Sequence, residues 1–206
     1  MTHLWVRSEQ RPNEDRTGLT PEGAGKLIAK GLRVTVEESQ SRIISLDGYR
    51  AAGCEIAPEN SWPDAPRDAI IFGLKELPDD STPLPHRHIM FGHAFKGQHA
   101  GRRLLERFKA GGGTLYDLEY LTHPDGRRVA AFGYWAGFVG AAVGILGVAH
   151  LSSARPGVVD ESFPSLSPYA DREALIAAVE AALASAALQR DLRFCWCSAR
   201  PSEWIS

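Results

Sequence analysis

The first 120 residues alternate between short apolar runs and amphipathic stretches, separated by polar turns. Apolar or alternating runs predict strands at residues 4–7, 33–37, 54–57, 70–74 and 89–91. Amphipathic spacing predicts helices at residues 20–31, 46–53 and 100–110, and Thr20 and Pro21 suit the beginning of the first helix. This order of strands and helices predicts an α/β fold, in which a Rossmann-like domain is built on a mostly parallel sheet.

The chain after residue 113 predicts a hairpin and a further helix. Residues 114–121 and 127–132 have strand patterns, and the four residues His123-Pro124-Asp125-Gly126 between them are typical of a hairpin turn. An Ala-rich helical pattern covers residues 171–189, and Asp171 can cap its beginning.

One long segment, residues 129–151, contains no Asp, Glu, Lys or Arg. Its length and apolarity qualify it as a membrane span, and Gly140 and Gly144 have the spacing of a membrane helix-packing motif. However, its first residues belong to the predicted hairpin, and the remainder, about residues 134–150, is short for a span. We therefore favour a buried helix between two domains, where glycines permit close packing.

Composition narrows the class of protein. The net charge of −2 gives no general reason to expect a nucleic acid or a membrane surface as partner. Three cysteines make no disulfide framework and suit a reducing compartment. Because the N-terminus becomes charged before an apolar core accumulates, we expect no signal peptide and a cytoplasmic protein. The oligomeric state stays open.

Polar side chains follow two of the predicted buried strands. Lys75 and Glu76 come after the first, and His93 comes after the second. Strand ends at one edge of a parallel sheet are where α/β enzymes build their sites. A partly buried lysine can act as a base, and histidine can shuttle protons near neutral pH. The alternative is an ordinary ion pair between Lys75 and Glu76 at the surface.

Other candidate groups have simpler interpretations. No cysteine or carboxylate lies at a familiar ligand spacing from the histidines, so we expect no metal site at His86, His88, His93 or His99. We expect His86 and His88 at the surface or next to the site. Arginines at positions 16, 127 and 128 could clamp carboxylates or be solvated. The chain has no convincing dinucleotide fingerprint, because its run of three glycines at 111–113 precedes a strand.

Several long blocks resemble the NAD-dependent, lysine-forming saccharopine dehydrogenases of the alanine dehydrogenase and transhydrogenase superfamily. These blocks are LWVRSEQRPNEDRTGLTP, IIFGLKELP, HIMFGHAFKGQ, GTLYDLEYL and GRRVAAFGYWAGFVGAA. The resemblance implies a substrate-binding domain at residues 1–133 and interdomain helices at 134–190. It further implies that a tail at 191–206 replaces the first strand of an NAD-binding Rossmann domain.

The resemblance also implies an activity, the reversible oxidative cleavage of saccharopine to lysine and 2-oxoglutarate with NAD as cofactor. Lys75 in the GLKE block matches the family's base, and His93 in the FGHAFK block matches its proton shuttle. Glu76 and Glu119 would tune these two groups by charge.

Saccharopine carries three carboxylates, and three cations match their expected clamps: Arg16, Lys96 and Arg128. Two alternatives remain. The chain could be a non-catalytic amino-acid-binding domain, or an alanine dehydrogenase-like enzyme acting on a smaller amino acid.

The tail DLRFCWCSARPSEWIS departs from the family pattern. Read from the last base of each codon, residues 193–197 recode as an apolar run that contains Leu-Leu-Val, as in a first Rossmann strand. We therefore expect a frameshift near residues 189–191 and a truncated NAD-binding domain that binds NAD poorly. The alternative is a natural C-terminus.

Overall fold

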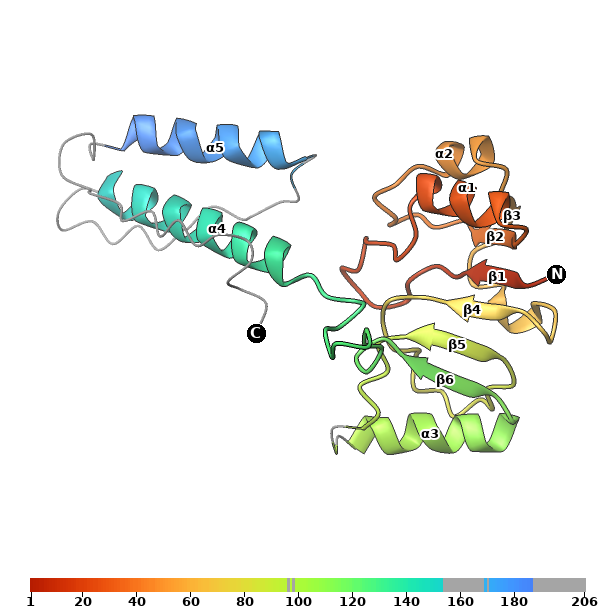
Figure 1. Ribbon diagram of the computed structural model, residues 1–206. Coiled ribbons are helices and arrows are strands. Elements are labelled where there is room, and N and C mark those ends of the chain that lie inside the picture. Colours follow the sequence, from red (N-terminus) through yellow and green to blue (C-terminus); the bar gives the residue numbers. More distant parts are fainter. Residues whose placement is uncertain (96, 98, 154–168, 170, 187–206) are drawn as a thin grey trace. The chain divides into compact units, whose positions relative to one another are not determined.

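The computed structural model describes residues 1–95, 97, 99–153, 169 and 171–186. It divides the chain into two compact units, Met1–Ala130 and Ala131–Ser206 (Figure 1). All the described residues that the sequence marks as site candidates belong to the first unit.

A single six-stranded parallel sheet forms the centre of the first unit. Its strands lie in the order β3-β2-β1-β4-β5-β6. The bounds are β1 His3–Val6, β2 Arg33–Glu37, β3 Glu55–Ala57, β4 Ile70–Phe72, β5 Arg87–Met90 and β6 Thr114–Asp117. The direction in which successive strands are added reverses between β1 and β4, which lie side by side and run parallel. This is the order of a Rossmann-like sheet and confirms the predicted α/β class.

Helices cover both faces of this sheet (Figure 1). Helices α1 (Pro21–Ala29) and α2 (Leu46–Ala51) pack on one face, and α3 (His99–Gly111) and the short 3-10 helix η1 (Trp62–Asp64) pack on the other. Thr20 caps α1 as predicted, because its hydroxyl accepts the Gly23 N–H at 3.1 Å. The first face buries Leu4, Val6, Ala24, Val34, Val36, Tyr49 and Cys54. The second buries Trp62, Ala65, Ala69, Ile71, Leu77, Leu84, Met90, Ala94, Leu104 and Phe108.

The run of three glycines ends α3, as the sequence predicts. Gly112 has a φ of 74°, in the left-handed region that favours glycine. A Cβ atom at Gly113 would overlap the carbonyl oxygen of His86. The chain can therefore turn back tightly from α3 into β6 beside β5.

The prediction that His86 and His88 lie at the surface is wrong. Both are buried, and His88 is only 1% exposed. The alternation along β5 directs His88 into the core, where its ring lies edge-on to Trp62 and Phe108. A central strand of a sheet covered on both faces has no solvent-exposed side. Burial lowers the pKa of His88 to about 3.

The predicted hairpin is also mostly wrong. Strand β6 ends at Asp117, and residues 127–132 form no strand, since only an isolated antiparallel bridge joins Thr122 and Arg128. The turn itself is present, with the His123 N–H bonded to the Arg127 carbonyl at 2.7 Å. The strand stops early because the chain turns immediately after Asp117, and the Tyr120 N–H bonds back to the Asp117 carbonyl at 3.0 Å.

In its described residues the second unit contains two helices that pack together, α4 (Gly133–Ser153) and α5 (Arg172–Ser185). The Asp171 carboxylate caps α5 as predicted, accepting the Ala174 N–H at 2.7 Å. The expected burial of α4 is not observed, since Tyr134 is 67% exposed. Helix α4 is apolar on all sides, and among the described residues α5 is the helix that packs against it.

Among the described residues, one helix is both long enough and apolar enough to cross a membrane. It covers Gly133–Ser152 and has a mean hydropathy of 1.6. Core helices of soluble proteins meet the same criterion. The predicted tail at residues 191–206 lies outside the described residues.

Candidate functional site

Turns that follow four neighbouring strands meet at the C-terminal edge of the sheet. Lys75 follows β4, and His93 follows the adjacent strand β5. Backbone hydrogen bonds join the turns, because Phe91 N–H donates to the Leu74 carbonyl at 2.9 Å and Leu118 N–H to the Met90 carbonyl at 2.9 Å. The fold thus brings the turns of Lys75 and His93 side by side, as the sequence predicts from strand ends.

The ammonium group of Lys75 faces a buried carboxylate. Its Nζ lies 4.0 Å from Glu14 Oε2, and the two side chains are 23% and 6% exposed. Glu14 comes from the long loop that follows β1, and the same carboxylate binds Arg16 through two bonds of 2.6 Å, from Nε and Nη2. One buried carboxylate therefore holds both the predicted base and a predicted carboxylate clamp.

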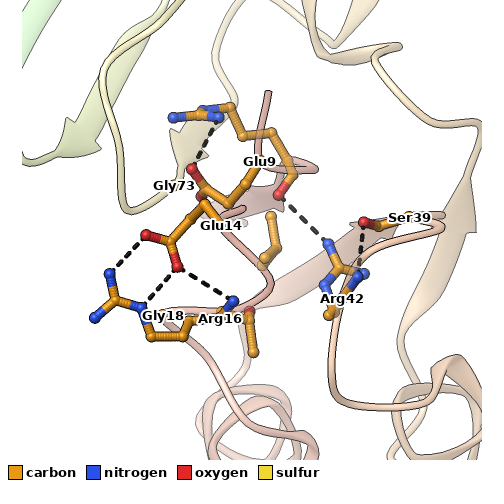
Figure 2. A pocket seen from close by; sticks show the side chains of 10 residues that line it. Glu9, Glu14, Arg16, Gly18, Ser39, Arg42 and Gly73 are labelled. Atoms are coloured by element: carbon orange, nitrogen blue, oxygen red, sulfur yellow. Dashed lines mark hydrogen bonds and ion pairs between the residues drawn. The ribbon is translucent and has the colours of Figure 1, made fainter. Parts of the chain in front are cut away.

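The pairing of Glu14 with Arg16 favours the charged form of both side chains. The hydrogen bond from Arg16 lowers the pKa of Glu14, and Lys75 adds a smaller effect in the same direction. Conversely, the bond to Glu14 raises the pKa of Arg16. Figure 2 shows the Glu14 carboxylate facing the Arg16 guanidinium in a pocket. The pocket is lined by Val6, Arg7, Glu9, Glu14, Arg16, Thr17, Gly18, Ser39, Arg42 and Gly73.

A second, deeper ion pair holds the backbone of Lys75. The carboxylate of Glu9 accepts the N–H groups of Leu74 at 2.7 Å and Lys75 at 3.0 Å. The guanidinium of Arg7, 3.4 Å from Glu9, donates to the carbonyl of Lys75. Gly73 is required beside this pair, because a Cβ atom there would overlap Arg7 Nε. The peptide groups on both sides of Lys75 are therefore fixed by buried charges.

The imidazole of His93 faces the carboxylate of Glu119. His93 Nδ1 lies 3.0 Å from Glu119 Oε2, and Arg128 Nη1 lies 3.5 Å from the other oxygen of the same carboxylate. His93 is half-buried, and its φ of 48° is in the left-handed region. The structure thus brings together three of the predicted site residues. His93 comes from the turn after β5, Glu119 from the turn after β6, and Arg128 from the isolated bridge.

Glu76 lies apart from these two carboxylate pairs. Its carboxylate is bonded to Arg11 at 2.9 Å, and both side chains are exposed. The ion pair between Lys75 and Glu76 that the sequence left open is replaced by pairs with Glu14 and Arg11. Lys96 lies outside the described residues.

The edge of this unit does not fit a dinucleotide. The residues directly after β1, 7–10, include no glycine, and the Ser8 N–H donates to Glu37 at 2.8 Å. Glu37, at the end of β2, has the position of a ribose-binding acid in Rossmann domains. However, it is fully buried and also accepts bonds from Trp5 at 2.9 Å and the Asn60 N–H at 3.0 Å. Its oxygens therefore satisfy internal donors instead of a ribose.

Metal ligation is not indicated either. In the part of the chain that the structure describes, no group of three or more His, Cys, Asp or Glu side chains could hold a metal ion. The chemistry that this edge offers is proton transfer and anion binding, from a lysine and a histidine that each face a carboxylate.

Sequence reasoning missed three buried carboxylates of this site, Glu9, Glu14 and Asp117. Glu9 and Glu14 lie in a highly charged loop whose pattern is typical of a solvated segment. Asp117 follows an apolar residue at a strand end, as many surface residues do. Their burial depends on contacts with distant turns, which no local spacing shows.

Comparison with known proteins shows the family to which the chain belongs. Residues 5–139 match the family model of the alanine dehydrogenase/PNT N-terminal domain. The chain is 48% identical over 174 residues to the saccharopine dehydrogenase (NAD(+), L-lysine-forming) of Candida glabrata. It is 45% identical over 175 residues to the protein of the same name from Schizosaccharomyces pombe. Each match covers 84% of this chain and 46% of the relative. The chain therefore spans about half the length of these relatives.

A solved structure titled L-alanine dehydrogenase is also similar, with a TM-score of 0.48 and 18% identity. The match covers 74% of this chain and 39% of that one.

Proposed function

The chain belongs to the alanine dehydrogenase/PNT N-terminal domain family, and we propose that Met1–Ala130 is the amino-acid-binding part of a lysine-forming saccharopine dehydrogenase. Relatives at 48% and 45% identity that carry this name support the substrate. The proposed reaction is the reversible oxidative cleavage of saccharopine to lysine and 2-oxoglutarate in lysine metabolism.

The observation that carries this proposal is the pairing of each predicted acid-base group with a carboxylate. Lys75 and His93 follow adjacent parallel strands and face Glu14 at 4.0 Å and Glu119 at 3.0 Å. Oxidation of a secondary amine begins from its neutral form, so a base must take the ammonium proton. Lys75 performs this step in its neutral form, because a neutral amine can accept the proton of a bound ammonium group.

His93 performs the second proton transfer, as water adds to the imine carbon and the carbinolamine then collapses. Glu119 orients the ring by accepting a hydrogen bond from Nδ1, which leaves Nε2 as the atom that exchanges protons with the substrate. Glu76 influences Lys75 and His93 through its charge and not through a direct contact.

Cations at the edge bind the carboxylates of saccharopine. Arg16 and Arg128 are held at the site by Glu14 and Glu119, so they are partly pre-positioned for a carboxylate ligand. Lys96 contributes a further positive charge. We propose NAD as the hydride acceptor, but assign it to no residue of Met1–Ala130, since this unit does not fit a dinucleotide.

The poor fit of Met1–Ala130 to a dinucleotide favours a second candidate function, an amino-acid-binding domain without redox activity. Calorimetric titration of saccharopine into the 206-residue chain, together with an assay of NADH oxidation by lysine and 2-oxoglutarate, separates the two. Binding with turnover that Lys75→Met or His93→Gln abolishes supports the dehydrogenase. Binding without turnover supports the binding domain only where the chain, joined to the remaining half of a saccharopine dehydrogenase relative, also fails to oxidise NADH. Preference for pyruvate and ammonia over lysine and 2-oxoglutarate would indicate an alanine dehydrogenase instead.

A further inference from the structure

Asp117 is a buried carboxylate to which the proposed reaction gives no role. It is the last residue of β6 and only 8% exposed. Its Oδ1 accepts two backbone hydrogen bonds, from the Gly92 N–H at 3.2 Å and from the Glu119 N–H at 3.0 Å. These amides belong to different turns. The Gly92 amide lies in the turn that carries His93, and the Glu119 amide lies in the turn after β6.

The turn at His93 needs such support. A non-glycine residue with a φ of 48° is held in a sparsely populated conformation, which persists only where the surroundings impose it. Gly92 is closely packed as well, since a Cβ atom there would lie 2.9 Å from Leu115 and 3.4 Å from Asp117 Oδ2. The bond from Asp117 is made to the N–H of Gly92, the residue directly before the strained one.

The hydrogen bond of the His93 ring depends on both turns. Nδ1 of His93 can reach Glu119 Oε2 at 3.0 Å only while the turns after β5 and β6 keep their separation. Among the described charged groups, Glu119 faces His93 directly, and Arg128 touches the far oxygen of that carboxylate. On the other side the ring stacks on Phe91, with 6.3 Å between centroids. A backbone bond from the Leu118 N–H to the Met90 carbonyl, at 2.9 Å, also joins the two turns, but it does not reach the residues next to the His93 ring as the bonds to Asp117 do.

We propose that Asp117 is a positioning residue that joins the two turns through Oδ1 and so fixes His93 against Glu119. It touches neither the proposed substrate nor the reacting atoms. Its importance for catalysis rests on the proposed role of His93, whereas the geometric claim stands by itself.

The tautomer of the His93 ring tests this proposal in the 206-residue chain. At pH 8.5 an ordinary histidine is neutral, and a free imidazole favours the proton on Nε2. Long-range ¹H–¹⁵N correlation spectra distinguish the two tautomers. In the wild type we expect the proton mainly on Nδ1, because Glu119 accepts it, and Glu119→Gln should weaken this preference.

Two substitutions separate positioning from charge. Asp117→Ala removes both bonds, so His93 should return to the distribution of a free imidazole. Asp117→Asn removes the charge but keeps Oδ1, and Oδ2 accepts no hydrogen bond from the described residues. It should therefore retain the Nδ1 tautomer. As a matched control, Asp125→Ala removes an exposed carboxylate that also accepts a backbone bond, from the Arg127 N–H at 3.0 Å, and should change nothing at His93.

Persistence of the Nδ1 tautomer in folded Asp117→Ala, or its equal loss in Asp117→Asn, would overturn the proposal. If Asp117→Ala does not fold, amide hydrogen exchange of the wild type decides. The amides of Gly92 and Glu119 should exchange slowly, and rates of unprotected amides would contradict the two bonds. Neither measurement needs saccharopine or a dinucleotide, so a failure here and a failure of the proposed function remain distinguishable.

Discussion

The buried ion pair behind Lys75 should make the fold sensitive to the substitution Glu9→Gln. The side chains of Arg7 and Glu9 are 0% and 6% exposed. Breaking a buried pair by neutralising one partner typically costs 3–5 kcal/mol, because it leaves an uncompensated charge. Arg7 would keep its bonds to the carbonyls of Ser8 and Lys75, so we expect the lower limit, about 3 kcal/mol of unfolding free energy.

The substitution should also loosen the turn that carries Lys75. Each oxygen of Glu9 accepts one backbone N–H, from Leu74 and Lys75. A glutamine amide offers one acceptor and places an NH₂ group against the other N–H, so one hydrogen bond is lost. Hydrogen exchange at the Lys75 amide should therefore become faster than the global loss of stability explains.

Native-state hydrogen exchange at the amides of Val6 and Ile71, in neighbouring central strands, measures the opening free energy of Met1–Ala130. The matched control is Glu22→Gln, which breaks the exposed pair of Glu22 with Lys26 on α1 and should have little effect. Equal losses of opening free energy in Glu9→Gln and Glu22→Gln, or a loss of opening free energy below about 1 kcal/mol for Glu9→Gln, would refute the reasoning.

Two further substitutions test the packing below and beside the site. His88 has a pKa of about 3 in the folded chain and an ordinary value of 6.5. Its stabilising effect is therefore complete above pH 6.5 and is lost as pH falls toward 3, by up to roughly 5 kcal/mol at 1.36 kcal/mol per pH unit. His88→Leu should flatten the decline of stability between pH 6.5 and 4.5 in urea unfolding, and an unchanged slope would argue against a buried neutral ring. Gly73→Ala should cost about 1–3 kcal/mol, because the new methyl group must displace Arg7. Its control Gly25→Ala, inside α1 with its nearest contact at 3.8 Å, should instead stabilise by about 0.5–1 kcal/mol; similar effects of both substitutions would contradict the clash.

The sheet could be predicted because its central strands are locally distinctive. Strand β2 has exactly its predicted bounds, since Val34 and Val36 point into one core and the flanking residues are polar. The helix caps at Thr20 and Asp171 also depend only on neighbouring residues. Local rules suffice where an element is stabilised by its own pattern.

The interior of the site could not be predicted in the same way. His88 looks like a surface histidine until Trp62 and Phe108, far away in the sequence, enclose it. Glu14 looks solvated until the turn after β4 places Lys75 beside it. The sequence therefore predicted which side chains meet at the strand ends, Glu119 included, but not the buried carboxylates Glu9, Glu14 and Asp117, because their burial arises from contacts between separate turns.

The most direct test of the account is a map of where saccharopine binds. Amide ¹H–¹⁵N spectra of the isotope-labelled 206-residue chain, recorded during titration with saccharopine, report perturbations residue by residue. We predict that they concentrate at the C-terminal edge of the sheet, around Arg16, Lys75, His93, Glu119 and Arg128. Perturbations confined to the opposite edge, near Arg33 and Glu55, or no change at millimolar saccharopine, would contradict the assignment of this edge as the substrate site.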